Sequence, residues 1–577
     1  MSGVHWTGQP FVDAGLAALA AVAKVNRLED LDEGHLKVAC RELERIMTSD
    51  QALGLNLDRA FAKSSLSQVF PNSELVNPSN WKNGPDGVRR KYRDALDQDL
   101  KRAIAAVRDQ SASLQRCVVC GDLRPAETFS PLRRDRLPLT SGAVNFYPGL
   151  AFGVELCGLC TLALRFLPLS VLRAGEGGRI WFLHCQELTV SGKIAEQYGW
   201  QHFNKQISAG QALDFYGEWR SAGVEGAVVR LLFQLLRQFP NQLRAIYELG
   251  IPAIAYVFSN DNRGGYVDAL PIPATLLDFL QSLLLESKQA FQDFEHQLLD
   301  LPPDLDKRKA DARRGFVQNI AQRMLRAEPL LSQCLVSTGD EGKQLLGGWI
   351  GHRLYLLEVY GMAPTTLAIL ERLGITLAQH DDAKKWLGRL ERARLNELRA
   401  ILLDMVRAQF LTARELAAVV PPNEPWAAGL ARDVVLAVAY EWQRYQANGA
   451  EFPRLLEMPQ YLETDGVIQR LERLAEQLRR GLQNPKAWLA DLSTARTVAQ
   501  IRGVYLRAVR QGALSASDFL FLVPFGEVSR VWQLRDYLLA FLFEQARDEL
   551  PPDLEVVEGE EATVALTGIE ESASLSQ

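Results

Sequence analysis

Seven cysteines occur in this chain of 577 residues, and four of them form two Cys-x-x-Cys pairs, Cys117/Cys120 and Cys157/Cys160. Each pair can fold as a tight turn that places both thiolates on one side of a metal ion. Two such turns complete a tetrahedral site with no position left for water. Gly121 follows the first pair and Gly158 lies inside the second, where we expect them to supply turn freedom. We therefore predict a structural Zn²⁺ that shapes the protein without doing chemistry.

The segment between the two pairs carries the first candidate for nucleic-acid binding. Its 36 residues exceed the spacing of a compact zinc ribbon, so we expect a zinc-stapled insertion over residues 112–165. The insertion contains three arginines that a metal-braced loop would hold against phosphates: Arg133, Arg134 and Arg136. A plain solvated loop is the alternative for the arginines, and unrelated buried thiols are the alternative for the cysteines. A redox pair is disfavoured because no thioredoxin-like βαβ unit surrounds either motif.

Two polar loops have side chains that can read the edges of bases. Residues 259–265 (SNDNRGG) lie between a predicted strand and a predicted helix, and they offer Asn260, Asn262 and Arg263. Asn and Arg form paired hydrogen bonds with bases, and the glycines permit close approach to a groove. Residues 72–83 are a second, weaker candidate, with Asn77, Asn80 and Lys82. Asn is also common in ordinary turns, so each loop has a purely structural alternative.

One predicted helix near the C-terminus has an arginine face. Between Asp491 and Asp518 there is no acidic residue, yet four arginines occur: Arg496, Arg502, Arg507 and Arg510. On a helical wheel Arg496, Arg507 and Arg510 lie opposite an apolar side, and Arg502 lies on the flank. Because no acid on the helix pairs with them, this face suits phosphate contacts without base specificity. An ordinary solvated helix face is the alternative.

A catalytic site is not expected. His380-Asp381 matches the dyad of HD metal-dependent phosphohydrolases, but such a site needs further His and Asp ligands. The nearest upstream histidine, His352, lies in an ordinary-looking helix. The sequence contains no GxxxxGK[ST] loop and no GxSxG elbow. We therefore predict a protein that is not an enzyme, and keep an HD-type nuclease as the competing hypothesis.

The hydrophobic periodicity predicts an α+β fold in several parts. Residues 1–270 form a mixed α/β domain with helices over 36–47 and 89–107 and strands over 179–190 and 251–258. Residues 271–425 form a mainly α-helical middle region that ends near the proline-rich PPNEP. Residues 426–548 form a C-terminal helical bundle, recognisable by an apolar stripe over 467–482. The tail 549–577 is acidic and predicted to be disordered.

Composition limits the function classes without choosing among them. The net charge of −6 gives no global basic signature, so nucleic-acid binding depends on local patches. No apolar run reaches the roughly 18 residues that a membrane span needs, and no export signal is recognised, so we expect a cytoplasmic protein without a membrane partner. In a reducing compartment paired cysteines favour metal over disulfides.

Taken together, the motifs resemble one family. Residues 6–19 (WTGQPFVDAGLAAL), the Asn72-Ser73 and 77–79 elements, the two CxxC pairs and the FSN sequence at 258–260 occur in one order. That order resembles the CXXC–CXXC family of large subunits of type I (I-B-like) CRISPR Cascade complexes. The resemblance covers the N-terminal half well and is only architectural for the helical remainder.

The resemblance implies a role in surveillance. Large subunits of this family recognise the protospacer-adjacent motif in duplex DNA, aid R-loop formation and hold the displaced strand, while the guide RNA reads the sequence. The implied partners are CRISPR RNA, target DNA, the Cascade backbone and cap subunits, and a recruited helicase–nuclease or transposition apparatus. Asn260, Asn262 and Arg263 would then read the motif first, the loop with Asn77 second. A zinc-stapled nucleic-acid scaffold outside CRISPR is a further alternative.

Some relatives make a free small subunit by internal initiation. Met458 and Met405 lie where such a start would release the C-terminal bundle, as products of 120 or 173 residues. We predict one of these as the start of a second product.

Overall fold

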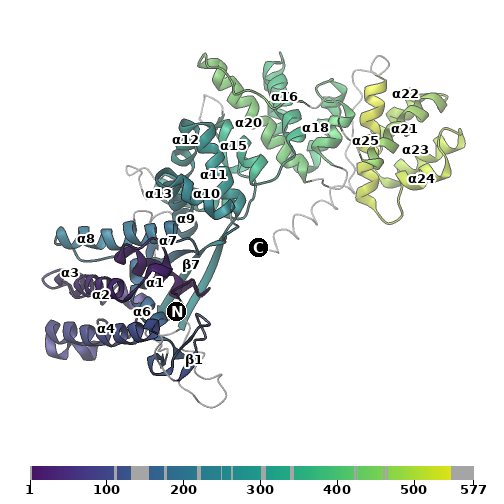
Figure 1. Ribbon diagram of the computed structural model, residues 1–577. Coiled ribbons are helices and arrows are strands. Elements are labelled where there is room, and N and C mark those ends of the chain that lie inside the picture. Colours follow the sequence, from purple (N-terminus) through teal and green to yellow (C-terminus); the bar gives the residue numbers. More distant parts are fainter. Residues whose placement is uncertain are drawn as a thin grey trace. The chain divides into compact units, whose positions relative to one another are not determined.

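The computed structural model describes residues 3–108, 113–131, 155–174, 178–217, 223–248, 250–261, 264–300, 307–337, 343–421, 424, 426–458, 462 and 465–546. The fold is mixed α+β, as predicted, and the chain divides into two compact units, Met1–Glu328 and Pro329–Gln577. Figure 1 shows helices throughout and a sheet within the first unit. The finer layout into three domains and a tail stays a prediction.

The first unit contains most of the described strands. Its helices are α1 (Pro10–Ala23), η1 (Leu28–Asp30), α2 (Glu33–Met47), α3 (Asp50–Leu53), η2 (Leu66–Gln68), η3 (Pro78–Asn83), α4 (Gly84–Arg108), η4 (Ala126–Thr128), α6 (Gly158–Phe166), η5 (Leu167–Leu169), α7 (Leu188–Ile194), η6 (Ala195–Trp200), α8 (Gln201–Ser208), α9 (Gly223–Gln238), α10 (Pro240–Glu248), α11 (Ala274–Glu286), α12 (Lys288–Leu299) and α13 (Lys307–Leu325). Its strands are β1 (Leu114–Arg116), β2 (Leu123–Pro125), β3 (Ser130–Pro131), β4 (Glu155–Leu156), β5 (Leu172–Ala174), β6 (Arg179–Cys185), β7 (Ala253–Asp261) and β8 (Gly264–Ile272).

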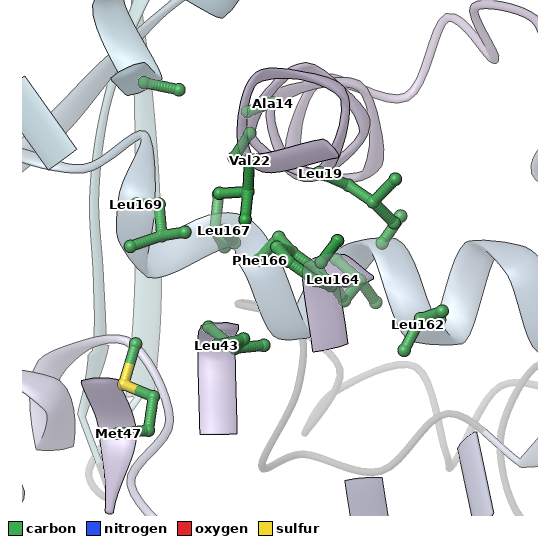
Figure 2. Packing of buried hydrophobic residues seen from close by; sticks show 14 of the residues in the cluster. Ala14, Leu19, Val22, Leu43, Met47, Leu162, Leu164, Phe166, Leu167 and Leu169 are labelled. Atoms are coloured by element: carbon green, nitrogen blue, oxygen red, sulfur yellow. The ribbon is translucent and has the colours of Figure 1, made fainter. Parts of the chain in front are cut away.

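Helix α1 forms the centre of this unit and is buried along nearly its whole length. An all-round apolar helix is stable only inside a core, and α1 lies directly against α6. Figure 2 shows Ala14, Leu19 and Val22 of α1 above the leucines of α6 and η5, with Leu43 and Met47 of α2 alongside. At the crossing, a Cβ on Gly15 would lie 2.0 Å from the carbonyl oxygen of Ala163, so only glycine allows the two backbones to pack this closely.

A buried polar clamp ties the start of α1 to the chain before it and to the sheet. The Asp13 carboxylate is fully buried and accepts hydrogen bonds from Thr7 N at 2.7 Å and Gly8 N at 3.0 Å. Its second oxygen also lies 3.1 Å from His184 Nε2 on β6. These contacts compensate the cost of burying the charge, and they attach residues 7 and 8 to the start of α1.

The main sheet has the order β5-β6-β7-β8 and is antiparallel throughout. The strand predicted over 179–190 ends early, because Glu187 caps a new helix by accepting a hydrogen bond from Thr189 N at 3.1 Å, and α7 begins at Leu188. The strand predicted over 251–258 is longer than expected. It continues to Asp261 and pairs with β8, so residues 259–265 connect two strands and not a strand and a helix.

The second unit is almost wholly helical, as the sequence predicts. Its elements are α14 (Leu331–Cys334), β9 (Leu335–Ser337), β10 (Lys343–Leu345), α15 (Gly348–Glu358), α16 (Pro364–Gln379), α17 (Ala383–Arg392), α18 (Leu395–Arg407), α19 (Ala413–Val419), α20 (Ala427–Ala447), α21 (Gly466–Gly481), α22 (Pro485–Ser493), α23 (Val498–Arg510), α24 (Ala516–Leu522) and α25 (Val528–Gln545). The β9–β10 hairpin is a departure from the prediction.

The predicted apolar stripe over 467–482 forms the inner face of α21. Ile468, Leu471 and Leu478 are buried, and α21 packs against α25. Helix α25 is itself buried from Val531 to Phe543, and it also packs against α18 and α19, which precede residue 426. By contrast, α20 packs mainly against α16. Packing therefore links the terminal helices to elements on the other side of the predicted 425/426 boundary.

Candidate metal centre and nucleic-acid interface

The four paired cysteines converge. Cys117 Sγ lies 3.9 Å from Cys160 Sγ, and Cys120 Sγ lies 3.9 Å from Cys157 Sγ. All four sulfurs lie within 4.8 Å of one another. A disulfide would need a sulfur separation of about 2.05 Å, so these are free thiols. Across the described ranges, no other group of three or more His, Cys, Asp or Glu side chains is as closely gathered for a metal ion.

The first pair is held by a short hairpin. Strands β1 and β2 pair directly before and after the turn, and Cys117 N donates to Asp122 O at 2.9 Å. Gly121 N donates to Cys117 O at 2.9 Å, and Gly121 has a φ of +75°. That left-handed conformation favours glycine, as predicted, and turns both thiols to one side.

The second pair begins helix α6. Cys157 is the N-cap residue and Cys160 lies in the first turn, so the two sulfurs share one side of the helix. The helix N-terminus favours negative charge such as thiolates. Gly158 does not supply turn freedom, contrary to the prediction. It is needed because a Cβ there would lie 2.4 Å from the backbone carbon of Arg102 on α4.

The four thiols influence one another's ionisation. Hydrogen bonding from Cys120, with further contributions from Cys157 and Cys160, lowers the pKa of Cys117. Hydrogen bonding with Cys117 and Cys120 raises the pKa of Cys157. The first charge therefore hinders the next, because like charges at this separation repel. A bound dication removes that conflict, which is the electrostatic behaviour expected of a metal-binding cluster.

Three further residues surround the cluster, and neither their types nor their positions in the sequence indicate this role. The Asp122 carboxylate lies 3.1 Å from His5 Nε2 and accepts a hydrogen bond from Arg124 Nη2 at 2.6 Å. Arg124 is buried, and its Nη1 donates to Ala106 O on α4 at 3.0 Å. These contacts attach the first turn to α4 and to the N-terminal segment, as outer partners of a metal site do.

The loop predicted to read bases is the end of a long β-ribbon. Strand β6 pairs with β7 only as far as Phe258, whereas β7 and β8 continue for three more pairs: Ser259 with Tyr266, Asn260 with Gly265 and Asp261 with Gly264. The ribbon forms the paired teal arrows in Figure 1. Asn260 is a residue of β7, and Tyr266 on β8 is 43% exposed. Asn262 and Arg263 fall outside the described residues.

The second loop uses its amides internally. Asn77 Oδ1 accepts from Ser79 N at 3.0 Å and from Ser79 Oγ at 2.8 Å, which begins η3. Asn80 Nδ2 donates to Glu74 O at 2.9 Å, and Asn80 Oδ1 accepts from Lys91. Lys82 is exposed. Asn77 and Asn80 thus stabilise the loop, which is the structural alternative stated for this segment.

The C-terminal arginines differ from the predicted face in two ways. Thr497 and Gln500 form a capping box, so α23 begins at Val498 and Arg496 precedes the helix. Arg507 forms an ion pair with Asp491 on α22, an acid outside the helix. Arg496, Arg502 and Arg510 are exposed, with no carboxylate partner among the described residues. Arg133, Arg134 and Arg136 lie outside the described residues.

The HD dyad has the contacts of a helix end. His380 is the C-cap of α16, its ring packs edge-on against Phe410 at 5.0 Å, and its Nδ1 accepts from Asp382 N at 3.1 Å. His352 is buried on α15 and its Nε2 donates to Leu346 O at 2.7 Å. The described part of the chain brings no second His or Asp cluster to this dyad.

No helix in the described ranges is both long and apolar enough to cross a membrane. Comparison of the chain with protein-family models, with curated proteins and with solved structures finds no match.

Proposed function

We propose that this chain is the large subunit of a type I CRISPR RNA-guided surveillance complex, which recognises a protospacer-adjacent motif and holds the displaced strand. The proposal extends the resemblance of its ordered motifs to the CXXC–CXXC family. The observation that supports it most is the β7–β8 ribbon, which extends three residue pairs beyond its neighbour in the sheet.

A free two-stranded ribbon can enter a groove of duplex DNA. The ribbon ends in Asn260, Asn262 and Arg263, followed by two glycines that add no side chain beside the DNA backbone. Short-motif reading needs few contacts, since the guide RNA reads the remaining sequence by base pairing. One ribbon tip is sufficient for that task.

We propose that the cysteine cluster holds Zn²⁺. Tetrahedral coordination at Zn–S distances of about 2.3 Å separates sulfurs by about 3.8 Å, which agrees with the two separations of 3.9 Å. The ion would brace the root of residues 132–154, which contain Arg133, Arg134 and Arg136, against α4 and α6.

The exposed arginines of the C-terminal bundle would contact the phosphates of the displaced strand. Arg502 and Arg510 lie on α23, and Arg496 directly precedes it. Each phosphate contact on a single strand contributes about 0.7 to the slope of log K against log salt. Arg502→Gln with Arg510→Gln should therefore weaken binding on all sequences and reduce that slope by about 1.4. Arg530→Gln, which removes a charge already paired with Glu527 at 3.1 Å, is the matched control.

The first experiment is purification of the tagged full chain from its native cells. We expect CRISPR RNA and the backbone subunits to co-purify. Their absence, with other nucleic acid retained, would favour a zinc-stapled scaffold outside CRISPR. Divalent-metal-dependent cleavage that disappears in His380→Ala would favour the nuclease.

The ribbon is tested by Asn260→Ala with Arg263→Ala in the assembled complex. We expect weaker binding only to targets that carry the correct motif, measured by electrophoretic mobility shift on matched and motif-scrambled duplexes. Asp268→Ala, an exposed change on β8 nearer the sheet, should leave both affinities unchanged. An equal loss on both duplexes would contradict motif reading.

A further inference from the structure

A small pocket lies where α21, α22 and α25 meet in the C-terminal bundle. Its lining is mostly apolar, with two cations: Leu482, Pro485, Trp488, Leu489, Leu542, Ala546, Arg479 and Lys486. Both cationic side chains are exposed, and Lys486 has no carboxylate partner among the described residues. Ala546, which directly follows α25, forms part of the wall, so the chain leaves the bundle at this pocket.

The charge of the bundle is opposite to that of the segment that follows it. Residues 466–546 contain eleven Lys or Arg and seven Asp or Glu. Residues 547–577 contain nine Asp or Glu and one Arg. The bundle is therefore net positive and the segment after it is net negative, in a chain whose overall net charge is −6. Their opposite charges attract at short range, where salt screens them least.

The first part of the acidic segment has the composition that the pocket would accept. Residues 548–555 read DELPPDLE, so two leucines alternate with carboxylates. Pro551 disfavours a helical conformation at Leu550, which limits continuation of α25. Leu550 is four residues beyond Ala546, a span of up to about 13 Å when extended, which is enough to return to the pocket wall.

We propose that residues 548–555 bind back over this pocket, with a leucine side chain covering its apolar lining and carboxylates beside Lys486. A consequence follows for the arginines. Gln483 N, just after α21, donates to the side chain of Gln511 at 3.3 Å, so the pocket adjoins the end of α23 that carries Arg510. The remaining acids of the tail then lie near arginines and compete with nucleic acid for them.

This competition rests on the proposed function, whereas the binding of the tail does not. Binding of the tail is therefore measured alone, in the absence of nucleic acid, by hydrogen-exchange mass spectrometry on the full chain. In Leu550→Ser with Leu554→Ser, we expect amides over 482–489 and 548–555 to exchange at least fivefold faster than in the native chain. Lys486→Glu should do the same. A Glu in the first turn of α22 is compatible with the helix, because a helix N-terminus favours negative charge.

Two control variants make the result specific. Leu566→Ser changes a leucine outside the proposed segment, and Arg530→Glu reverses a charge about 24 Å away along α25. Both should leave the exchange over 482–489 unchanged. The proposal would be overturned if the amides over 482–489 and 548–555 exchanged at the same rate in the native chain as in the leucine variant and in Lys486→Glu.

Single-stranded oligonucleotide binding then tests the competition. The leucine variant should bind several-fold more tightly than the native chain at low salt. If the exchange data support tail binding but affinity is unchanged, the tail does not compete with nucleic acid. If oligonucleotide binds the native chain while the exchange rates do not differ, the tail proposal fails and the proposed function stands.

Discussion

At the scale of single residues, the proposed Zn²⁺ would need all four clustered thiols. A structural zinc site has no spare ligand, so on this proposal Cys157→Ser should reduce bound zinc from one ion per chain to near zero, measured by inductively coupled plasma mass spectrometry. Cys185→Ala, a change at a buried thiol outside the cluster, should retain one ion. Full zinc content in Cys157→Ser would show that the ion binds elsewhere.

A buried histidine predicts acid sensitivity. Burial lowers the pKa of His352 from its usual 6.5 to about 4. Between those values the unfolded chain binds a proton and the folded chain does not, so the free energy of unfolding decreases as the pH falls from 6.5 to 4. The loss amounts to about 3 kcal/mol and ceases below the folded pKa.

The variant His352→Gln tests this directly. Glutamine can still donate to Leu346 O, but it does not titrate in this range. Urea unfolding at pH 7 and pH 4.5 should show a smaller pH dependence in the variant than in the native chain. An unchanged pH dependence would mean that other groups cause the acid sensitivity.

The sequence predicts the cysteine cluster because the spacing within each pair is local. It does not predict the contacts of Asp122 with His5 or of Arg124 with α4. His5 and Asp122 are 117 positions apart, and nothing in the types of the two residues selects that pairing over many others. The sequence does allow a structural role for Asn77 and Asn80 within their own loop, because Asn commonly begins turns.

At the scale of elements, the α1–α6 crossing makes glycine essential at one position. Alanine normally favours a helix over glycine by about 1 kcal/mol. Gly15→Ala should nevertheless destabilise the first unit, because the added Cβ would lie 2.0 Å from Ala163 O. Gly503→Ala on α23 has no atom within 4 Å of the new Cβ and should be neutral or stabilising. Thermal unfolding of both variants measures the difference.

A buried ion-pair network joins α4, α6 and the loop before η3. Arg165 Nε donates to Asp99 Oδ2 at 2.8 Å, and its Nη1 donates to Glu74 at 2.7 Å. Asp99 is only 1% exposed, so Arg165→Met removes the nearer of its two arginine partners and leaves Arg102 at 3.6 Å from the buried carboxylate. We expect a loss of about 3–5 kcal/mol in the free energy of unfolding.

The double variant distinguishes lost pairing from lost packing. Arg165→Met with Asp99→Asn removes both charges and should recover part of the stability, measured by urea denaturation. No recovery would mean that the cost of Arg165→Met arises from packing against Tyr92, whose ring lies 5.7 Å from the guanidinium.

The sequence predicts elements well where one periodicity dominates, as in α21. It predicts them poorly where a capping residue or pairing with another strand determines where the element begins or ends. Thr497 shortens α23 at its start and removes Arg496 from the helix, and Glu187 ends the strand region early. The sequence does not predict strand β8, because Gly264, Gly265 and Pro271 are poor strand formers and only pairing with β7 compensates for them.

At the scale of the whole molecule, the two compact units predict two unfolding events, and the proposed Zn²⁺ would stabilise only the unit that contains the cysteine cluster. Removing the ion with a strong chelator should lower the midpoint of the unit with the cysteines and leave that of Pro329–Gln577 unchanged. Differential scanning calorimetry with and without chelator tests this. A shift of both transitions would show that the two units unfold as one.

The packing also shows that the two candidate internal starts would give products with different sets of intact helices. Met405 is fully buried within α18, so a product from there would lack most of that helix. Met458 precedes α21, and its product would keep α21 to α25. That product would lose α18 and α19, against which α25 packs, so it would expose apolar surface unless another chain covers it.

Residues 5–8 link two features that lie far apart in the sequence. His5 contacts Asp122 beside the cysteine cluster, and two residues later Thr7 donates to Asp13, which also contacts His184 on β6. Strand β6 pairs with β7, the strand that carries the ribbon tip. A short series of hydrogen bonds and paired strands therefore connects the cysteine cluster to the ribbon. Loss of the His5–Asp122 contact would therefore loosen the segment that holds Thr7 beside Asp13, and with it the contact of Asp13 with His184 on β6.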